Sequence, residues 1–76
     1  MNYYQRLRDI REDNDLKQED IAKILNIKQT QYSRYELGKN DMKIENYIKL
    51  AIFYNTSLDY LTGIIDEPRK IFPDKK

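Results

Sequence analysis

The 76-residue sequence contains no cysteine and no histidine. A chain without them can form neither disulfides nor the zinc sites of small domains. It also lacks the usual base of a nucleophile–base pair, so we expect no enzyme, no cofactor and no metal. The acidic run "DNDLKQED" over residues 13–20 does not change this expectation. Lys17 stands where a calcium loop needs its third oxygen ligand, and Gln18 where it needs glycine.

Long apolar runs are also missing. The opening residues, "MNYYQRLRDIRED", lack the apolar centre of a signal peptide, and no stretch approaches the length of a membrane span. A chain this short forms one small domain and buries only roughly 60–65% of the surface of its unfolded state. We therefore expect a complete, soluble, cytoplasmic protein with a thin margin of stability and no membrane partner.

Neither sign of charge predominates, because 14 basic and 13 acidic residues leave a formal net charge of +1. Residues 1–27 carry five basic and six acidic side chains, whereas residues 28–49 carry five basic and three acidic ones. An imbalance of this size is common on solvated surfaces, so it is only a weak indication of an anionic partner.

Only 2 glycines and 2 prolines interrupt the chain, and apolar residues recur three and four positions apart, as on one face of a helix. This spacing predicts an all-α domain with five helices over residues 3–13, 18–25, 29–37, 44–54 and 58–61. Ser57 is placed to cap the last helix, and Gly63 to end it. We expect the first helix to turn Tyr3, Leu7 and Ile10 inward. In the fourth helix the expected inward residues are Ile44, Tyr47, Ile48, Ala51 and Tyr54, with Leu50 on the flank.

Residues 18–37 contain two of these helices with only a tight corner between them. Ala22 falls where the two helices would cross at a steep angle, and a larger side chain there would force them apart. Asn26 occupies the corner, where a positive φ is required. The side chains expected in their shared core are Ile21, Leu25, Ile27, Tyr32 and Tyr35. This pattern is typical of a helix-turn-helix, whose second helix is presented outward to enter the major groove of DNA.

The segments "QEDIAKIL", "YSRYELGKN" and "LAIFYNTSLDYLTG" resemble the Cro/repressor-type (Xre-like) helix-turn-helix family of bacteria and their phages. The resemblance covers about residues 4–63. It implies a compact five-helix, lambda-repressor-like DNA-binding domain over residues 1–63, with residues 64–76 as a C-terminal tail. It also implies a transcriptional regulator that is usually a dimer on double-stranded DNA.

The resemblance further implies a buried ion pair between Arg11, at the inward edge of the first helix, and Glu36, on the inner side of the third. Such a pair would tie the first helix to the end of the recognition helix. The alternative is two unrelated surface charges, which would contribute about 0–1 kcal/mol at most.

With Tyr32, Tyr35 and Glu36 turned inward, helical geometry points Thr30, Ser33, Arg34 and Leu37 outward, with Gln29 and Gln31 on the flanks. Gln29 is able to make a bidentate contact to adenine, Arg34 to guanine, and Thr30 a methyl contact to thymine. The family commonly reads bases from the positions that Gln29, Thr30 and Arg34 hold here, with Ser33 nearby. The alternative is a solvated helix face, and Arg34 is also long enough to reach a phosphate instead of a base.

Phosphate contacts position a protein on DNA without specifying the sequence. The candidates for such contacts are Gln18, Lys28, Lys39, Asn40 and Lys43. Lysines also stand at the expected N-caps of the second, third and fourth helices, where the family usually has serine or threonine. A lysine cannot accept the capping hydrogen bond, so these positions either gain a phosphate contact or reflect drift in a lysine-rich chain. Met42 replaces a proline common in the family, so we expect a looser loop before the fourth helix.

Three functions remain in competition. The first is a sequence-specific regulator, expected to be a repressor that binds a near-palindrome as a homodimer. The second is the antitoxin of a toxin–antitoxin pair, and the third is a protein-interaction module that keeps the fold without binding DNA. No effector domain follows the motif, so we expect no small-molecule ligand.

The tail carries four apolar side chains, Ile64, Ile65, Ile71 and Phe72. Two placements are open for them. They fold back over the fifth helix, or they form a dimer seam together with Leu58, Tyr60 and Leu61.

Overall fold

A computed structural model of the chain describes residues 3–73. Its helices are α1 (Gln5–Asp13), α2 (Gln18–Leu25), α3 (Gln29–Glu36), α4 (Ile44–Tyr54) and α5 (Leu58–Leu61). No strand occurs between residues 3 and 73, so the predicted all-α fold with five helices is confirmed. None of these helices is both long and apolar enough to span a bilayer.

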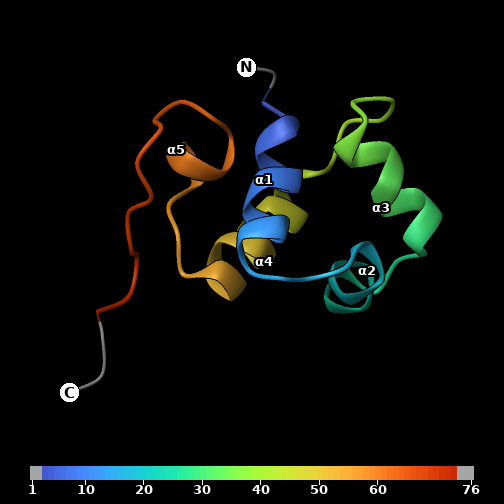
Figure 1. The fold of residues 1–76 in the computed structure, drawn as a ribbon, viewed down its shortest axis with the longest axis horizontal. Coiled ribbons are helices and arrows are strands. Elements are labelled where there is room, and N and C mark those ends of the chain that lie inside the picture. The colour runs from blue at the N-terminus through green and yellow to red at the C-terminus, as the bar shows by residue number, and fades with distance from the viewer. Residues whose placement is uncertain (1–2, 74–76) are drawn as a thin grey trace.

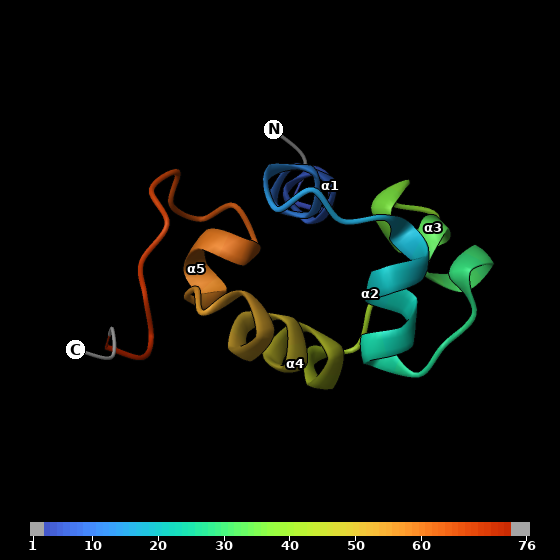
Figure 2. The same cartoon turned by 60° about the horizontal axis from the view of Figure 1, so that its bottom comes forward.

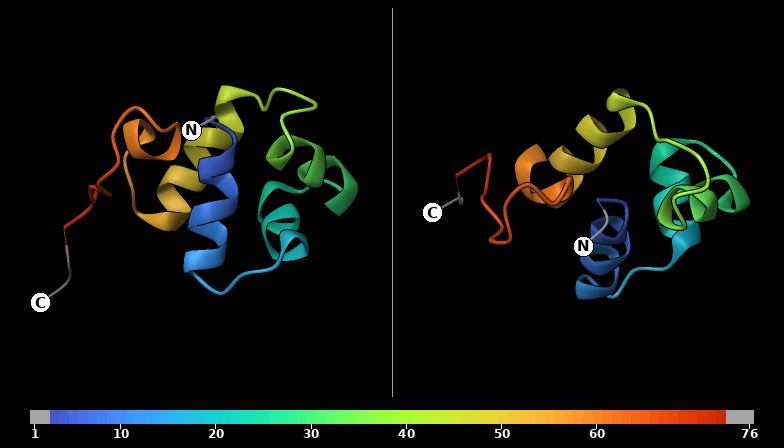
Figure 3. Two further views of the ribbon diagram at one scale, coloured as in Figure 1. Left: turned by 45° about the horizontal axis from the view of Figure 1, so that its top comes forward. Right: turned by 90° about the horizontal axis from the view of Figure 1, so that it is seen from above.

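Helices α1 and α4 lie between α5 on one side and the α2–α3 pair on the other (Figures 1 and 3). The core is built from all five helices. Its most deeply buried side chains, one from each helix, are Leu7, Ile21, Tyr32, Leu50 and Leu61. Because every helix is short, this shared burial, rather than the helix propensity of any one segment, holds the elements together.

The predicted inward faces of α1 and α4 are only partly right. Tyr3 lies before the first turn of α1 and keeps 45% of its surface exposed. In α4 the fully buried residue is Leu50, whereas Ile44 and Ile48 are 59% and 44% exposed. Tyr47 and Ala51 are buried as predicted, together with Leu50. Apolar residues occupy more than one face of α4, so their spacing alone did not fix the edges of the buried stripe. Contact with the rest of the core turned the buried stripe toward Leu50 and away from Ile44 and Ile48.

Asparagine makes the turns at two helix ends. Asn26, after α2, has φ 57°, and Asn55, after α4, has φ 52°. This confirms the left-handed conformation predicted for Asn26, which asparagine tolerates better than most residues. Ser57 also caps α5 as predicted, because its hydroxyl accepts a hydrogen bond of 3.2 Å from the backbone N–H of Tyr60.

The tail folds back against the corner between α4 and α5. The side-chain oxygen of Asn55 accepts hydrogen bonds from the backbone N–H groups of Ile71 (3.2 Å) and Phe72 (2.8 Å). The backbone N–H of Ser57 donates to the carbonyl of Arg69 at 2.9 Å. Residues 74–76 of the predicted tail lie outside the described residues. Leu61 is fully buried, so it cannot belong to the dimer seam that was one of the alternatives.

Candidate nucleic-acid interface

The corner between α2 and α3 sets how far α3 stands out from the core. Ala22 is 3% exposed, and its small side chain allows α3 to cross close to α2. Its carbonyl accepts a hydrogen bond of 2.9 Å from the backbone N–H of Ile27, which closes the turn around Asn26. Figure 2 shows α3 at one end of the molecule, away from α5 and the tail.

One face of α3 is buried and the opposite face is open. Tyr32, Tyr35 and Glu36 form the buried face. The residues predicted to read bases lie on the other side: Gln29, Thr30 and Arg34 are exposed, and Ser33 is half-buried. Leu37, just after the helix, is exposed as well. The structure thus brings all four predicted base-reading side chains onto one solvent-facing surface.

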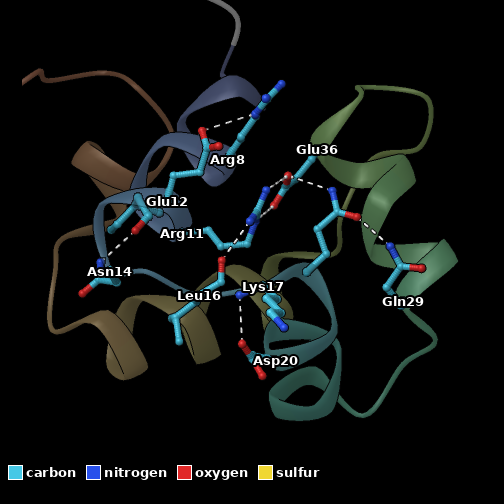
Figure 4. A network of polar contacts seen from close by, with 11 residues as sticks. Arg8, Arg11, Glu12, Asn14, Leu16, Lys17, Asp20, Gln29 and Glu36 are labelled. Carbon is cyan, nitrogen blue, oxygen red and sulfur yellow. Dashed lines mark hydrogen bonds and ion pairs between the residues drawn. The ribbon is translucent and has the colours of Figure 1, made fainter.

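Arg11 and Glu36 form a bidentate ion pair behind this surface (Figure 4). The Arg11 Nε lies 2.7 Å from Glu36 Oε2, and Nη2 lies 3.0 Å from Oε1. The remaining guanidinium nitrogen, Nη1, donates to the carbonyl of Leu16 at 2.9 Å. The side chains are only 12% and 2% exposed, so the alternative of two unrelated surface charges is wrong.

Glu36 stays ionised despite its burial. Burial opposes its charged form, but the hydrogen bonds from Arg11 and Gln18 and the nearby Tyr32 hydroxyl outweigh this effect and lower the pKa of Glu36. The Tyr32 hydroxyl is fully buried, and its position does not meet the geometry of a standard hydrogen bond to Glu36 or to any other described residue. Burial, followed by the neighbouring Glu36 carboxylate, raises the pKa of Tyr32 well above its ordinary value. The hydrogen bond to Glu36 raises the pKa of Arg11.

Two glutamines extend the ion pair to the surface. Gln18 Nε2 donates to Glu36 Oε1 at 3.1 Å, and Gln29 Nε2 donates to Gln18 Oε1 at 2.6 Å. Gln18 was predicted to contact phosphate and Gln29 to read a base, as separate residues. The structure joins them, with Gln29 at the exposed end of the Arg11–Glu36–Gln18–Gln29 chain. Gln18 and Gln29 lie 11 positions apart but on different helices, so no periodicity within one helix linked them.

The other predicted phosphate-contacting residues lie next to the ends of α3 and α4. Lys28 precedes α3, Lys39 and Asn40 follow it, and Lys43 precedes α4. All four side chains are exposed. They are thus available to an anion, and none takes part in the core.

The lysines at the helix starts leave the expected capping bonds unmade. Lys17, Lys28 and Lys43 are the N-caps of α2, α3 and α4, and none forms a side-chain cap hydrogen bond. At α2, the Asp20 carboxylate instead accepts a hydrogen bond of 2.8 Å from the backbone N–H of Lys17. This contact satisfies one N–H group at the helix start. Among residues 3–73 no group of acidic side chains is arranged to hold a metal ion.

Residues 7–61 match the helix-turn-helix family. Over 66 residues the chain is 33% identical to YobD of Bacillus subtilis, an uncharacterized HTH-type transcriptional regulator, covering 87% of the chain and 59% of YobD. It is 34% identical over 58 residues to the transcriptional repressor RstR of the cryptic phage CTXphi from Vibrio cholerae, covering 76% of the chain and 52% of RstR. The chain thus spans between half and three fifths of these relatives.

A solved structure shares the fold. The crystal structure of a transcriptional regulator from Listeria innocua superposes with a TM-score of 0.78 at 26% sequence identity. The match covers 96% of the chain and 65% of the Listeria protein.

Proposed function

The chain belongs to the Cro/repressor-type helix-turn-helix family, and on this premise we propose that it is a sequence-specific DNA-binding repressor whose helix α3 enters the major groove. The observation that carries the proposal is the open face of α3, where Gln29, Thr30 and Arg34 are exposed and Ser33 is half-buried beside them. A structural surface helix does not need such a concentration of side chains that match base edges.

Gln29 is the side chain whose orientation is best supported. Its Nε2 donates a hydrogen bond to Gln18, and Gln18 donates one to the buried Glu36. A side chain held before binding loses less rotamer entropy when it contacts a base. The Gln29 carbonyl oxygen and its second N–H then remain for the N6 and N7 atoms of an adenine. Arg34 would contact guanine, and Thr30 a thymine methyl.

The phosphates on either side of α3 would be contacted by the residues at the helix ends, namely Gln18 at the start of α2, Lys28, Lys39, Asn40 and Lys43. These contacts set the register of α3 in the groove without selecting the sequence. A single α3 reads only a few base pairs, so a homodimer on a near-palindrome, with half-sites about 34 Å apart, would supply the specificity.

Selection of sites from a random pool of duplex DNA tests the proposal. We expect an enriched palindrome, and an affinity for it that falls linearly with the logarithm of salt concentration. Sedimentation of the complex would give two chains per site. No enrichment over the starting pool would contradict sequence-specific binding, and affinity indifferent to salt would contradict phosphate contacts.

A further inference from the structure

The loop between α3 and α4 carries two of the proposed phosphate contacts, Lys39 and Asn40. Its start is fixed by backbone hydrogen bonds from Gly38 to the carbonyl of Tyr35 (3.2 Å) and from Lys39 to that of Arg34 (3.0 Å). Near its end, Met42 is 7% exposed and anchors the loop in the core. Burial of Met42 thus holds the loop, contrary to the expectation that it is loosened by the replacement of the family's proline.

The residues before α1 contact this loop on both sides of Lys39 and Asn40. The Tyr3 hydroxyl donates a hydrogen bond of 2.7 Å to Asp41 Oδ1, across 38 positions of sequence. The Tyr4 ring lies so close to Gly38 that a side-chain carbon added there would collide with it. Gly38 has φ +72°, a conformation that glycine adopts without strain.

Tyr3 and Tyr4 also contact each other. Their ring centroids are 5.5 Å apart and their planes meet at 77°, which is an edge-to-face arrangement. The ring pair therefore contacts the loop at Gly38 and Asp41 as one unit. The segment between these two contacts consists of Lys39 and Asn40.

We propose that Tyr3 and Tyr4 are positioning residues that hold segment 38–41 so that Lys39 and Asn40 meet a DNA phosphate. This inference rests on the proposed DNA-binding function. Neither tyrosine needs to touch DNA in this role. An ordered loop binds more tightly than a mobile one, because the backbone of Lys39 and Asn40 is not immobilised during binding.

Substitutions at Tyr3 and Asp41 separate the hydrogen bond from the charge. Tyr3→Phe removes only the hydroxyl and keeps both ring contacts. Asp41→Asn and Asp41→Ala both remove the negative charge, but only asparagine keeps an oxygen that accepts from Tyr3. Thr62→Val is the matched control, because the Thr62 hydroxyl makes a bond of similar length, 2.7 Å, to the Leu58 carbonyl in α5, remote from α3.

The affinity of each variant for the selected site would be measured across a range of salt concentrations. We expect Tyr3→Phe to weaken binding about three- to tenfold and to reduce the salt slope by about one phosphate contact. The base preference should stay unchanged. Tyr3→Phe should weaken binding equally when it is combined with Asp41→Asn, which keeps the acceptor oxygen. Combined with Asp41→Ala, which has no acceptor, Tyr3→Phe should cause no further loss of affinity. Thr62→Val should leave the affinity and the slope unaltered.

Three outcomes would overturn the proposal, and they separate the positioning role from the proposed function. Salt-dependent binding by the wild-type protein with an unchanged slope for Tyr3→Phe would overturn the positioning role alone. The positioning role would also be overturned if Tyr3→Phe weakened binding as much in the Asp41→Ala background as in the wild-type protein. Wild-type protein that enriches no site from the random pool would overturn the proposed function, and the positioning role with it.

Discussion

The Nε of Arg11 lies 2.7 Å from Oε2 of Glu36, although 25 positions separate the two residues. This contact joins α1 to the last turn of α3 in the interior of the molecule. Glu36 also accepts a hydrogen bond from Gln18, which accepts one from Gln29 on the surface. The ion pair that joins α1 to α3 therefore also supports the side chain that we propose as a base reader, so the contact between these helices and the proposed recognition of DNA share one network.

Glu36→Ala should destabilise the protein by about 3–5 kcal/mol, because it leaves the Arg11 guanidinium buried without its partner. For a domain of this size each kcal/mol corresponds to about 4–8 °C in melting temperature. Urea denaturation followed by circular dichroism measures the loss. Glu12→Gln is the control, since it breaks the exposed Arg8–Glu12 pair, whose side chains are 62% and 53% exposed. Similar losses for the two variants would contradict a buried ion pair.

The pKa of Glu36 predicts a loss of stability in acid. Its pKa in the folded state lies below its ordinary value, so the charged form stabilises the fold above the unfolded-state pKa of about 4.3. This stabilisation is lost as the pH falls through the folded-state pKa. The wild-type free energy of unfolding should therefore fall more steeply below about pH 4.3 than that of Glu36→Gln. If the difference in free energy of unfolding between wild type and Glu36→Gln stayed constant from pH 7 to strong acid, the lowered pKa of Glu36 would be refuted.

Gln18 and Gln29 should act as a unit in DNA binding. Gln29→Ala should weaken binding by about 1–3 kcal/mol at the site with its preferred base. Gln18→Ala should weaken it as well, by freeing Gln29, and the double variant should lose less than the sum of the two. Gln31→Ala is a suitable control, because the Gln31 amide bonds to the Tyr35 hydroxyl instead. Strict additivity of the Gln18 and Gln29 effects would mean that the two contacts with DNA are independent.

Thr30→Ala and Arg34→Ala should relax the sequence preference while leaving the helical content intact. The expected loss of discrimination is about 1–3 kcal/mol for each contacted base pair. Competition between the selected site and single-base variants of it would measure this. Lys39→Ala should behave differently, with a similar loss on all sequences and a salt slope smaller by about one. Unaltered base preference in both α3 variants would place the recognition surface elsewhere.

Much of the fold was predictable because its determinants are local. The bounds of α2 follow from an apolar stripe preceded by carboxylates and closed by Asn26, which takes the left-handed conformation as expected. The predictions failed where a segment offered more than one apolar face. In α4 either Ile48 or Leu50 could have been buried, and only packing against the other helices placed Leu50 inside.

The candidate surface was predictable in composition but not in connectivity. Helical geometry alone places Thr30 and Arg34 opposite Tyr32 and Tyr35. The Gln18–Gln29 bond and the Tyr3–Asp41 bond join residues 11 and 38 positions apart. No repeating pattern marks such pairs, because each depends on how two segments far apart in the fold are placed relative to each other.

The sequence by itself determined the five helices, the corner at Asn26 and the polar outer face of α3. These features depend on helical periodicity, capping and backbone φ, which act over a few neighbouring residues. Only the tertiary structure decided which face of α4 is buried, how Gln29 is tied to Glu36, and that Tyr3 and Tyr4 contact the loop carrying Lys39 and Asn40. Such choices are made by the simultaneous packing of all five helices around one core, where the position of each side chain depends on all the others.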